Sequence, residues 1–360
     1  MKIATIIGAR PQFIKASVVC RAADKQQGIN EVLIHTGQHF SPNMSDVFFE
    51  DLNIRQPDYN LEIGGGTHGQ NTGRMIESIE DILLKEKPDY VLVYGDTDST
   101  LAGAIASVKL NIPLAHVEAG LRSYNRSMPE EINRILTDHA ADLLFVPTNT
   151  ATINLEREGI PREKIHYVGD VMYDASIYYR SVARQPHGLK LSGEEFVIAT
   201  IHRAENTDNP DRMKGIVRIL KQIGKIMPIV LPIHPRTEVV LKKLELYESL
   251  KKFVHIMGPV GFKEMTWLLS NCKLVLTDSG GIQKEAYFNE KPCMTLRDET
   301  EWVELLEEGY NRLVSPLETD VHNIFNEMLK REVCTSSNLY GAGNAAKNIV
   351  SIILQQQIES

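Results

Sequence analysis

Cysteine is scarce in this chain and forms no recognisable metal or disulfide pattern. The 360 residues include four cysteines, and no two of them form a CxxC pair. Their scattered positions argue against a zinc site and a disulfide framework, and fit a reducing compartment. The sequence therefore predicts a cytoplasmic protein without a structural metal.

Long apolar runs and an excess of positive charge are also missing. The apolar run within residues 1–12 is too short for a signal peptide or a membrane span, and is typical of a buried first strand. The formal net charge is -8 at pH 7, whereas a general nucleic-acid binder is usually basic. We therefore expect neither a membrane nor a nucleic acid as a partner, although local arginine clusters can still bind phosphate.

Several common enzyme motifs are absent. There is no GxSxG elbow, no Ser/His/Asp arrangement, no candidate cysteine nucleophile and no Walker loop. A GxGxxG string occurs at residues 64–69, but no clear strand precedes it inside a first βαβ unit. We interpret it as a flexible loop, and the sequence predicts no cofactor.

What the chain does contain is a regular alternation of short apolar runs with helical patterns. Near-continuous apolar strands between helices indicate parallel sheets covered on both faces, which is an α/β fold. The expected strands are residues 3–7, 31–35, 90–94, 113–117, 143–146, 196–201, 229–233, 254–257, 274–277 and 292–296.

The pattern is interrupted near residues 169–193, where a helical stretch is followed by a polar segment with proline and glycine. The chain is long enough for two domains. We therefore expect two doubly wound domains facing across a cleft, over residues 1–170 and 171–344. A C-terminal helix over residues 345–360 is expected to pack back on the first domain.

The segment from His116 to Arg134 is rich in charge and follows a predicted strand. Glu118 and Glu130 lie there among arginines, at a strand end of the kind where open α/β sheets build their sites. Acids beside guanidinium groups suit proton transfer on an anionic substrate. A solvated loop that opens a helix at Pro129 explains the same residues, so the segment alone leaves both interpretations open.

Other strand ends carry cations. Arg10 and Lys15 follow the first strand, which suggests contact with a diphosphate or a carboxylate; ordinary surface charge is the alternative. His202 and Arg203 follow the first strand of the second domain and suit phosphate binding. A histidine whose hydrogen bonds are satisfied at the strand end is the competing interpretation.

A strand, a small-residue turn and a helix start occur together at residues 273–285. Asp278 and Ser279 are natural caps, while Gly280 and Gly281 let backbone N–H groups approach a ligand, so the turn favours phosphate over an ordinary βα turn. Glu285, one turn on, would accept hydrogen bonds from a ribose diol or act only on the helix dipole.

Two aspartates, Asp96 and Asp98, follow the strand at residues 90–94. They are candidates for acid–base or metal roles. Helix capping is the alternative, and one of the two is expected to cap. A magnesium site lacks a second carboxylate motif to support it.

Eight strings together resemble the bacterial non-hydrolysing UDP-N-acetylglucosamine 2-epimerases, over essentially the whole chain. They are GARPQFIK, GQH, VYGDTDSTLA, HVEAGLRS, MPEEINR, HRAEN, LTDSGGIQKEA and RDETE. The resemblance implies the glycosyltransferase-B architecture, with two Rossmann-like domains and the nucleotide sugar in the cleft between them. It also implies UDP binding by the C-terminal domain and a homodimer.

The family chemistry eliminates UDP to give a 2-acetamidoglucal, then adds UDP back after C2 is reprotonated on the other face. That scheme needs a base, an acid on the opposite face and firm anchoring of the diphosphate. By resemblance, the catalytic positions are Asp96, Glu118, Glu130 and His202. The positions implied for UDP or the sugar are Arg10, Lys15, Ser279, Gly280, Gly281 and Glu285, and the residues themselves add Arg122 and Arg203 as candidates for substrate binding.

Two departures from the family pattern bear on the substrate. Trp302 stands where the family's TERPE string has a substrate-contacting arginine, and the regulatory QHxxM string is lengthened to residues 38–44. The sequence is closer to a subgroup that epimerises UDP-2,3-diacetamido-2,3-dideoxyglucuronate for O-antigen or capsule synthesis. Arg122 or Arg126 would then meet the extra carboxylate. A UDP-N-acetylglucosamine 2-epimerase and, from another class, a glycosyltransferase of the same fold are the alternatives.

Overall fold

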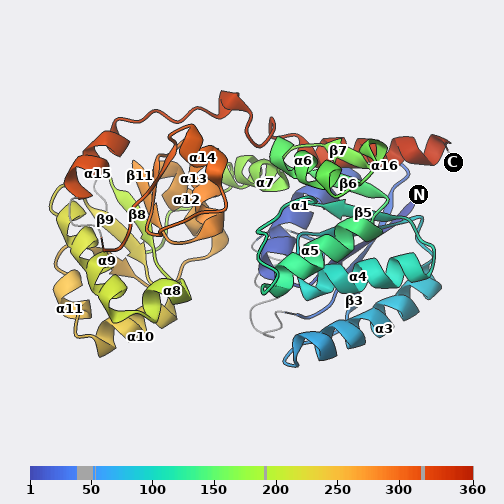
Figure 1. Ribbon diagram of the computed structural model, residues 1–360, viewed down its shortest axis with the longest axis horizontal. Coiled ribbons are helices and arrows are strands. Elements are labelled where there is room, and N and C mark those ends of the chain that lie inside the picture. The colour runs from blue at the N-terminus through green and yellow to red at the C-terminus, as the bar shows by residue number, and fades with distance from the viewer. Residues whose placement is uncertain (39–51, 53, 190–192, 318–320, 360) are drawn as a thin grey trace. The chain divides into compact units, whose positions relative to one another are not determined.

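The computed structural model describes residues 1–38, 52, 54–189, 193–317 and 321–359 (Figure 1). The chain divides into two compact units. Unit 1 comprises Met1–Ala175 and Tyr340–Ser360, and unit 2 comprises Ser176–Leu339. The division falls inside α7 (Val171–Arg180), so one continuous helix carries the chain from unit 1 into unit 2.

Unit 1 is built on a seven-stranded parallel sheet with the order β3-β2-β1-β4-β5-β6-β7. The strand order reverses between β1 (Lys2–Ile7) and β4 (Tyr90–Tyr94), which makes their carboxyl ends the switch point of the sheet. The remaining strands are β2 (Asn30–His35), β3 (Tyr59–Asn60), β5 (Leu114–Val117), β6 (Leu143–Val146) and β7 (Ile165–Tyr167).

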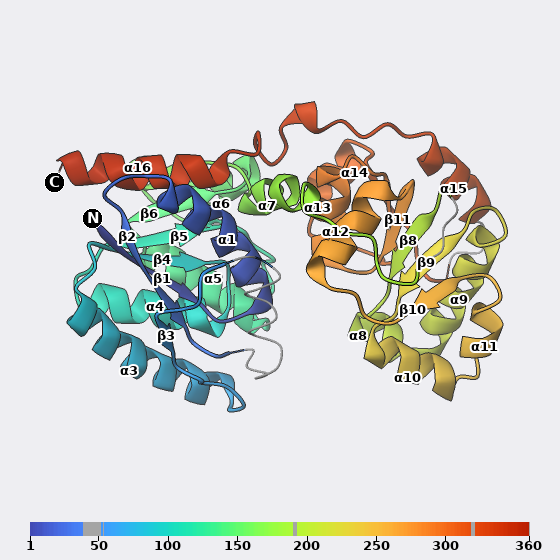
Figure 2. The same ribbon diagram turned by 180° about the vertical axis from the view of Figure 1, so that it is seen from behind.

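Helices cover this sheet on both faces (Figures 1 and 2). One core forms where buried side chains such as Ile6 and Val93 of the sheet meet Met75 and Ile79 of α3. The C-terminal helix α16 packs against α1, so the two ends of the chain meet on the same unit. The helices are α1 (Arg10–Asp24), α3 (His68–Glu86), α4 (Asp98–Lys109), α5 (Pro129–Ala140), α6 (Asn149–Arg157) and α16 (Ala345–Glu359).

Unit 2 repeats the design with a six-stranded parallel sheet in the order β10-β9-β8-β11-β12-β13. Its switch point lies between β8 (Val197–Thr200) and β11 (Leu274–Thr277). The other strands are β9 (Ile229–Pro232), β10 (His255–Met257), β12 (Cys293–Thr295) and β13 (Asn311–Leu313).

The pleat of β8 explains why unit 2 has two cores. Val197 and Ala199 point to one face and join a core with α9 and α15, whereas Ile198 points to the other face and packs with Leu268 of α12. Because both faces of β8 are buried, its sequence is a near-continuous apolar run. The helices are α8 (Ala204–Thr207), α9 (Pro210–Ile223), α10 (Pro235–Lys243), α11 (Tyr247–Leu250), α12 (Phe262–Asn271), α13 (Gly280–Phe288), α14 (Val303–Glu307) and α15 (Val321–Leu329).

The predicted α/β class with two doubly wound sheets is confirmed, and each expected strand is present within one or two residues of its predicted ends. The sequence analysis missed β3, β7 and β13, which are two or three residues long and lie at sheet edges. Such short edge strands carry too little apolar pattern to be recognised. No helix in the described ranges is long and apolar enough to span a membrane.

Candidate active site

Gln12 joins the two loops at the switch point of unit 1. This buried side chain accepts hydrogen bonds from the backbone N–H of Gly8 (2.8 Å) and Ala9 (2.9 Å), and donates to the carbonyl oxygen of Tyr94 (2.7 Å). The turn after β1 is therefore tied to the end of β4. The sequence analysis did not single out Gln12; a polar residue on the buried face of α1 was the available signal.

Glu118, directly after β5, is held in a strained and mostly buried position. Its φ of 70° lies in the left-handed region, which is rare for residues other than glycine and clusters at active sites. Its carboxylate forms an ion pair with Lys15 of α1. Gly95 lies against this pair, because a Cβ there would be 3.2 Å from both Glu118 Oε2 and Lys15 Nζ. The structure thus brings together two residues that the sequence analysis assigned to different tasks.

Asp96 is oriented from α5. Its carboxylate pairs with Arg134 at 2.6 Å, and its carbonyl oxygen accepts from Asn133 Nδ2 at 3.0 Å. The Asp96 side chain is still 31% exposed, so the carboxylate is ordered and accessible at once. These are the features that a positioned proton donor or acceptor requires.

The two consecutive glutamates at the start of α5 have different environments. Glu131 is buried and accepts from the backbone N–H of Ser123 (2.9 Å) and Tyr124 (2.8 Å). Burial opposes its ionisation, yet these bonds and the ion pair with Arg134 hold the pKa of Glu131 below its usual value. The carboxylate of Glu130 is partly exposed and has no hydrogen-bond or ion-pair partner among the described residues. Glu131 therefore builds the loop, and Glu130 remains available for chemistry.

The role in substrate binding that the sequence suggested for Arg122 does not agree with its surroundings. Its side chain is 1% exposed and pairs with Asp138 and with Glu158, both at 2.7 Å. The buried Asp138 also binds His116 Nδ1 (2.7 Å) and accepts from the backbone N–H of Gly120 (3.1 Å). Arg122 is thus a member of a buried network that shapes the loop after β5, and the structure does not support its assignment to the substrate.

Asp98 also differs from expectation, because neither it nor Asp96 caps α4. Thr97 is the N-cap residue, and its hydroxyl accepts a backbone N–H. The buried Asp98 instead binds His68 Nδ1 at 2.8 Å and accepts from Asn133 Nδ2 at 3.3 Å. His68 comes from the GxGxxG string, which leads directly into α3 and is not an isolated flexible loop.

In unit 2, Asp278 orients the turn after β8. The expectation that it caps α13 is wrong, since this fully buried carboxylate accepts from the backbone N–H of His202 (3.0 Å) and Arg203 (3.1 Å). It also accepts from Asn206 Nδ2 at 3.1 Å. One carboxylate therefore fixes the backbone of two candidate residues and leaves their side chains partly exposed.

The environment of His202 favours the neutral imidazole. Its ring lies 5.7 Å from the ring of His234, and its Nδ1 is 3.7 Å from Asp278 Oδ1. Burial lowers the pKa of His202, the charge of Asp278 opposes this, and His234 and Arg203 lower the pKa further. A neutral, half-exposed imidazole is available as a hydrogen-bond partner for a ligand.

The start of α13 is packed against the segment at Glu301 and Trp302. Ser279 occupies the N-cap position but makes no side-chain cap hydrogen bond. Trp302 Nε1 donates to the carbonyl oxygen of Gly280 at 2.9 Å, and Glu301 occupies the space that a Cβ of Gly280 would need. Arg203 lies 3.6 Å from Glu301, so the structure brings together the cation and the glycine turn.

Arg10, Gly281 and Glu285 are the remaining candidates for anchoring. Arg10 is an exposed first residue of α1, and a Cβ at Gly281 would meet no atom within 4 Å. Burial raises the pKa of Glu285 to about 7, with Lys284 acting in the opposite direction. Of the lengthened regulatory string, residues 39–44 lie outside the described residues.

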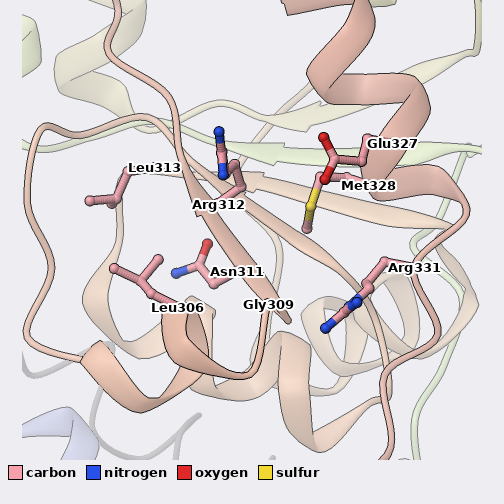
Figure 3. A pocket seen from close by; sticks show the side chains of 8 residues that line it. All are labelled: Leu306, Gly309, Asn311, Arg312, Leu313, Glu327, Met328 and Arg331. Atoms are coloured by element: carbon pink, nitrogen blue, oxygen red, sulfur yellow. The ribbon is translucent and has the colours of Figure 1, made fainter.

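The cavity in Figure 3 lies away from the candidate residues, and the described residues that line it form no metal site. In the described part of the chain, no group of three or more His, Cys, Asp or Glu side chains could hold a metal ion. The cavity has a volume of about 400 Å³, and none of the candidate residues lines it. Its lining residues are Leu306, Gly309, Asn311, Arg312, Leu313, Glu327, Met328 and Arg331.

Candidate acid–base groups follow β4 and β5 of unit 1, and in unit 2 a helix start without a side-chain cap lies beside His202 and Arg203; strand ends and helix N-termini of this kind are where α/β enzymes bind anionic ligands. The family model described as UDP-N-acetylglucosamine 2-epimerase matches residues 21–354. The chain belongs to this family and is therefore an isomerase, a UDP-sugar 2-epimerase with two Rossmann-like units of the glycosyltransferase-B type.

Relatives support this at the level of both sequence and structure. The chain is 54% identical to the UDP-2,3-diacetamido-2,3-dideoxy-D-glucuronate 2-epimerase of Pseudomonas aeruginosa, over 98% of this chain and 99% of the relative. The UDP-GlcNAc 2-epimerase of Methanocaldococcus jannaschii, solved with UDP-GlcNAc and UDP, matches with a TM-score of 0.83 and 45% identity, over 99% of this chain and 100% of that one. The Neisseria meningitidis enzyme bound to UDP-GlcNAc matches with a TM-score of 0.86 and 31% identity, over 99% and 100%.

Proposed function

We propose that the protein epimerises C2 of UDP-2,3-diacetamido-2,3-dideoxy-D-glucuronate to the manno form. The observation that carries the reaction type is the set of three carboxylates in unit 1, Asp96, Glu118 and Glu130, which lie on the loops after β4 and β5 and at the start of α5. The identity of 54% to the P. aeruginosa enzyme supports the choice of the uronate.

The reaction proceeds by loss and return of UDP. A carboxylate removes the C2 proton, the C1–O bond breaks, and UDP leaves a 2-acetamidoglucal. A second acid then protonates C2 on the opposite face while a UDP oxygen attacks C1. Acid–base groups contribute about 10²- to 10⁴-fold to such steps. Asp96, Glu118 and Glu130 supply the proton-transfer groups, and Lys15 neutralises charge beside Glu118.

The released UDP is retained by the anchoring groups of unit 2. The first N–H groups of α13 at Ser279, Gly280 and Gly281 bind phosphate, with Arg203 beside them and His202 as the fourth catalytic group. Glu285 accepts the ribose hydroxyls. Arg10 is a further candidate contact of the sugar diphosphate, as the family resemblance implies. We propose that the protein is a cytoplasmic homodimer and that its product is a precursor for the synthesis of O-antigen or capsule.

Incubation with the UDP-uronate alone in deuterated water tests the reaction type. An epimerase forms both epimers, and each carries one deuterium at C2 by mass spectrometry. A glycosyltransferase requires an acceptor, so the absence of both exchange and epimerisation would contradict the proposal.

The substrate is tested by comparing kcat/KM on the uronate with kcat/KM on UDP-N-acetylglucosamine. Of the two arginines considered for the C6 carboxylate, Arg126 has an exposed side chain, whereas that of Arg122 is buried. We expect Arg126→Ala to lower kcat/KM on the uronate about tenfold, with the value on the neutral sugar unchanged. The exposed Arg157 provides the matched control, Arg157→Ala. A higher wild-type kcat/KM on the neutral sugar would instead identify a UDP-N-acetylglucosamine 2-epimerase.

A further inference from the structure

His68 is tied to the candidate site by a short chain of hydrogen bonds. Its Nδ1 binds Asp98 Oδ2 at 2.8 Å, and the other oxygen of Asp98 accepts from Asn133 Nδ2 at 3.3 Å. The same amide nitrogen donates to the carbonyl oxygen of Asp96 at 3.0 Å. The buried Asp98 carboxylate thus connects the imidazole at the start of α3, through Asn133, to the backbone of Asp96.

The periodicity of α5 places Glu130 beside this chain. Asn133 and Arg134 are three and four residues after Glu130, so all three share one face of the helix. Asn133 contacts Asp98 and Arg134 contacts Asp96, which means that this face is the one turned to the site. Glu130 lies one turn closer to the N-terminus of α5 on that face.

The imidazole of His68 contacts Asp98, is influenced by the charge of Glu130 and is open to water. Its hydrogen bond to Asp98, the charge of Asp98 and the charge of Glu130 together raise the pKa of His68. Asp98 from α4 and Glu130 from α5 are the charged groups of the described residues that act on it. The His68 side chain is 70% exposed, so it exchanges protons with solvent readily.

A C2 epimerase of the proposed type must restore its acid–base groups after every turnover. One group has gained the proton taken from C2, and another has lost the proton delivered to the opposite face. The carboxylate that is left protonated has to release its proton, and the one left bare has to regain one, before the same direction of reaction can run again.

We propose that His68 is a positioning residue that sets and renews the protonation state of Glu130. This rests on the function proposed above. The imidazolium passes its Nε2 proton through solvent water to the partly exposed Glu130 carboxylate, which forms a carboxylic acid and a neutral imidazole, and water then returns a proton to Nε2. The reverse sequence carries a proton from Glu130 to solvent. Asp98 holds the ring through Nδ1 in both directions.

Histidine NMR titration of the whole protein tests the coupling without any turnover. We expect the His68 midpoint to fall clearly in Asp98→Asn and to fall by a smaller amount in Glu130→Gln. A His68 midpoint unaffected by Glu130→Gln would overturn the proposal. Because this readout needs no substrate, it is independent of whether the proposed epimerisation is observed.

Steady-state kinetics test whether loss of the His68 imidazole slows turnover. His68→Ala should lower kcat about 10- to 100-fold with UDP affinity unchanged, and added imidazole should restore a large part of the rate. His255→Gln serves as the control for loss of an exposed histidine. Unchanged kcat in His68→Ala, or a loss that imidazole does not relieve and that follows a lowered Tm, would show a purely structural role and overturn the proposal.

Discussion

The two units share one topology but place different groups at the switch points of their sheets. In unit 1 the carboxylates face cations, Glu118 with Lys15 and Asp96 with Arg134. In unit 2 the carboxylate of Asp278 is fully buried and satisfied largely by backbone N–H groups. In both units the fold places the carboxylates at the carboxyl ends of parallel strands. The groups that pair with each carboxylate determine whether it stays accessible or is fully buried.

The difference in exposure between these carboxylates matches the two tasks that we propose, proton transfer in unit 1 and the anchoring of UDP in unit 2. An acid that moves protons must be positioned and still accessible, as the partly exposed Asp96 is. An acid that only shapes a turn is most effective when it is buried and fully hydrogen-bonded, as Asp278 is. Substitutions of the candidate carboxylates of unit 1 should therefore lower kcat, whereas substitutions at the start of α13 in unit 2 should weaken the binding of UDP.

The largest effect is expected for Glu118→Gln. Loss of an acid–base group whose position is fixed by a strained backbone should lower kcat about 10³-fold, while UDP affinity changes by no more than a few fold. Epimerisation followed by NMR and calorimetric titration of UDP measure the two quantities. The exposed Glu163→Gln is the matched control. Near-normal turnover in Glu118→Gln would remove the distinction between the units.

Arg122→Ala should affect folding far more than specificity. Removing this guanidinium takes the cationic partner from the buried Asp138 and from Glu158, while Asp138 keeps its bonds to His116 and to the N–H of Gly120. We expect the free energy of unfolding to fall by about 3–5 kcal/mol, which urea denaturation would measure. Arg157→Ala should leave stability within about 0.5 kcal/mol. A stable Arg122→Ala protein with a selective loss of activity on the uronate would restore the role expected from sequence.

Gly280→Ala tests the anchoring role of unit 2. The added methyl group must displace Glu301, which lies against Gly280 and beside Arg203. UDP affinity should fall about tenfold, equivalent to about 1.4 kcal/mol, with kcat at saturating substrate much less affected. Gly258→Ala is the control, because a Cβ there meets no atom within 4 Å. A large loss of kcat at full saturation would contradict the division of labour.

The smallest effect is a pH dependence of ribose binding. Glu285 has a pKa of about 7 in the free protein because burial disfavours its charged form. The ribose hydroxyls donate to the carboxylate, so affinity should rise as pH increases through 7 and level off above it. Between pH 6 and 8 the ionised fraction rises about tenfold, which sets the upper limit of the change.

Uridine is the appropriate ligand for this titration, because it has no phosphate that titrates in the same range. Glu285→Gln should abolish the dependence and bind uridine about equally at every pH. An affinity that falls with rising pH in the unsubstituted protein would exclude the carboxylate as the ribose acceptor.

Much of this organisation could be predicted from sequence because it depends on local patterns. A continuous apolar run such as residues 274–277 is recognisable as a buried strand. The small residues Ser279, Gly280 and Gly281 that follow it predict the start of a helix. The candidates that the structure corrects are charged residues whose partners are distant in sequence. Arg122 meets Glu158, and Asp98 meets His68, across 36 and 30 residues respectively.

The sequence by itself therefore determined the α/β class, the doubly wound sheets and the strand ends that carry the chemistry. Only the tertiary structure decided which of the adjacent Glu130 and Glu131 is buried, which arginine is locked in a network, and that His68 reaches Asp98. The reason is physical: strand and helix formation follow from near-neighbour periodicity, whereas the state of a charged side chain depends on burial and on partners brought together by the fold.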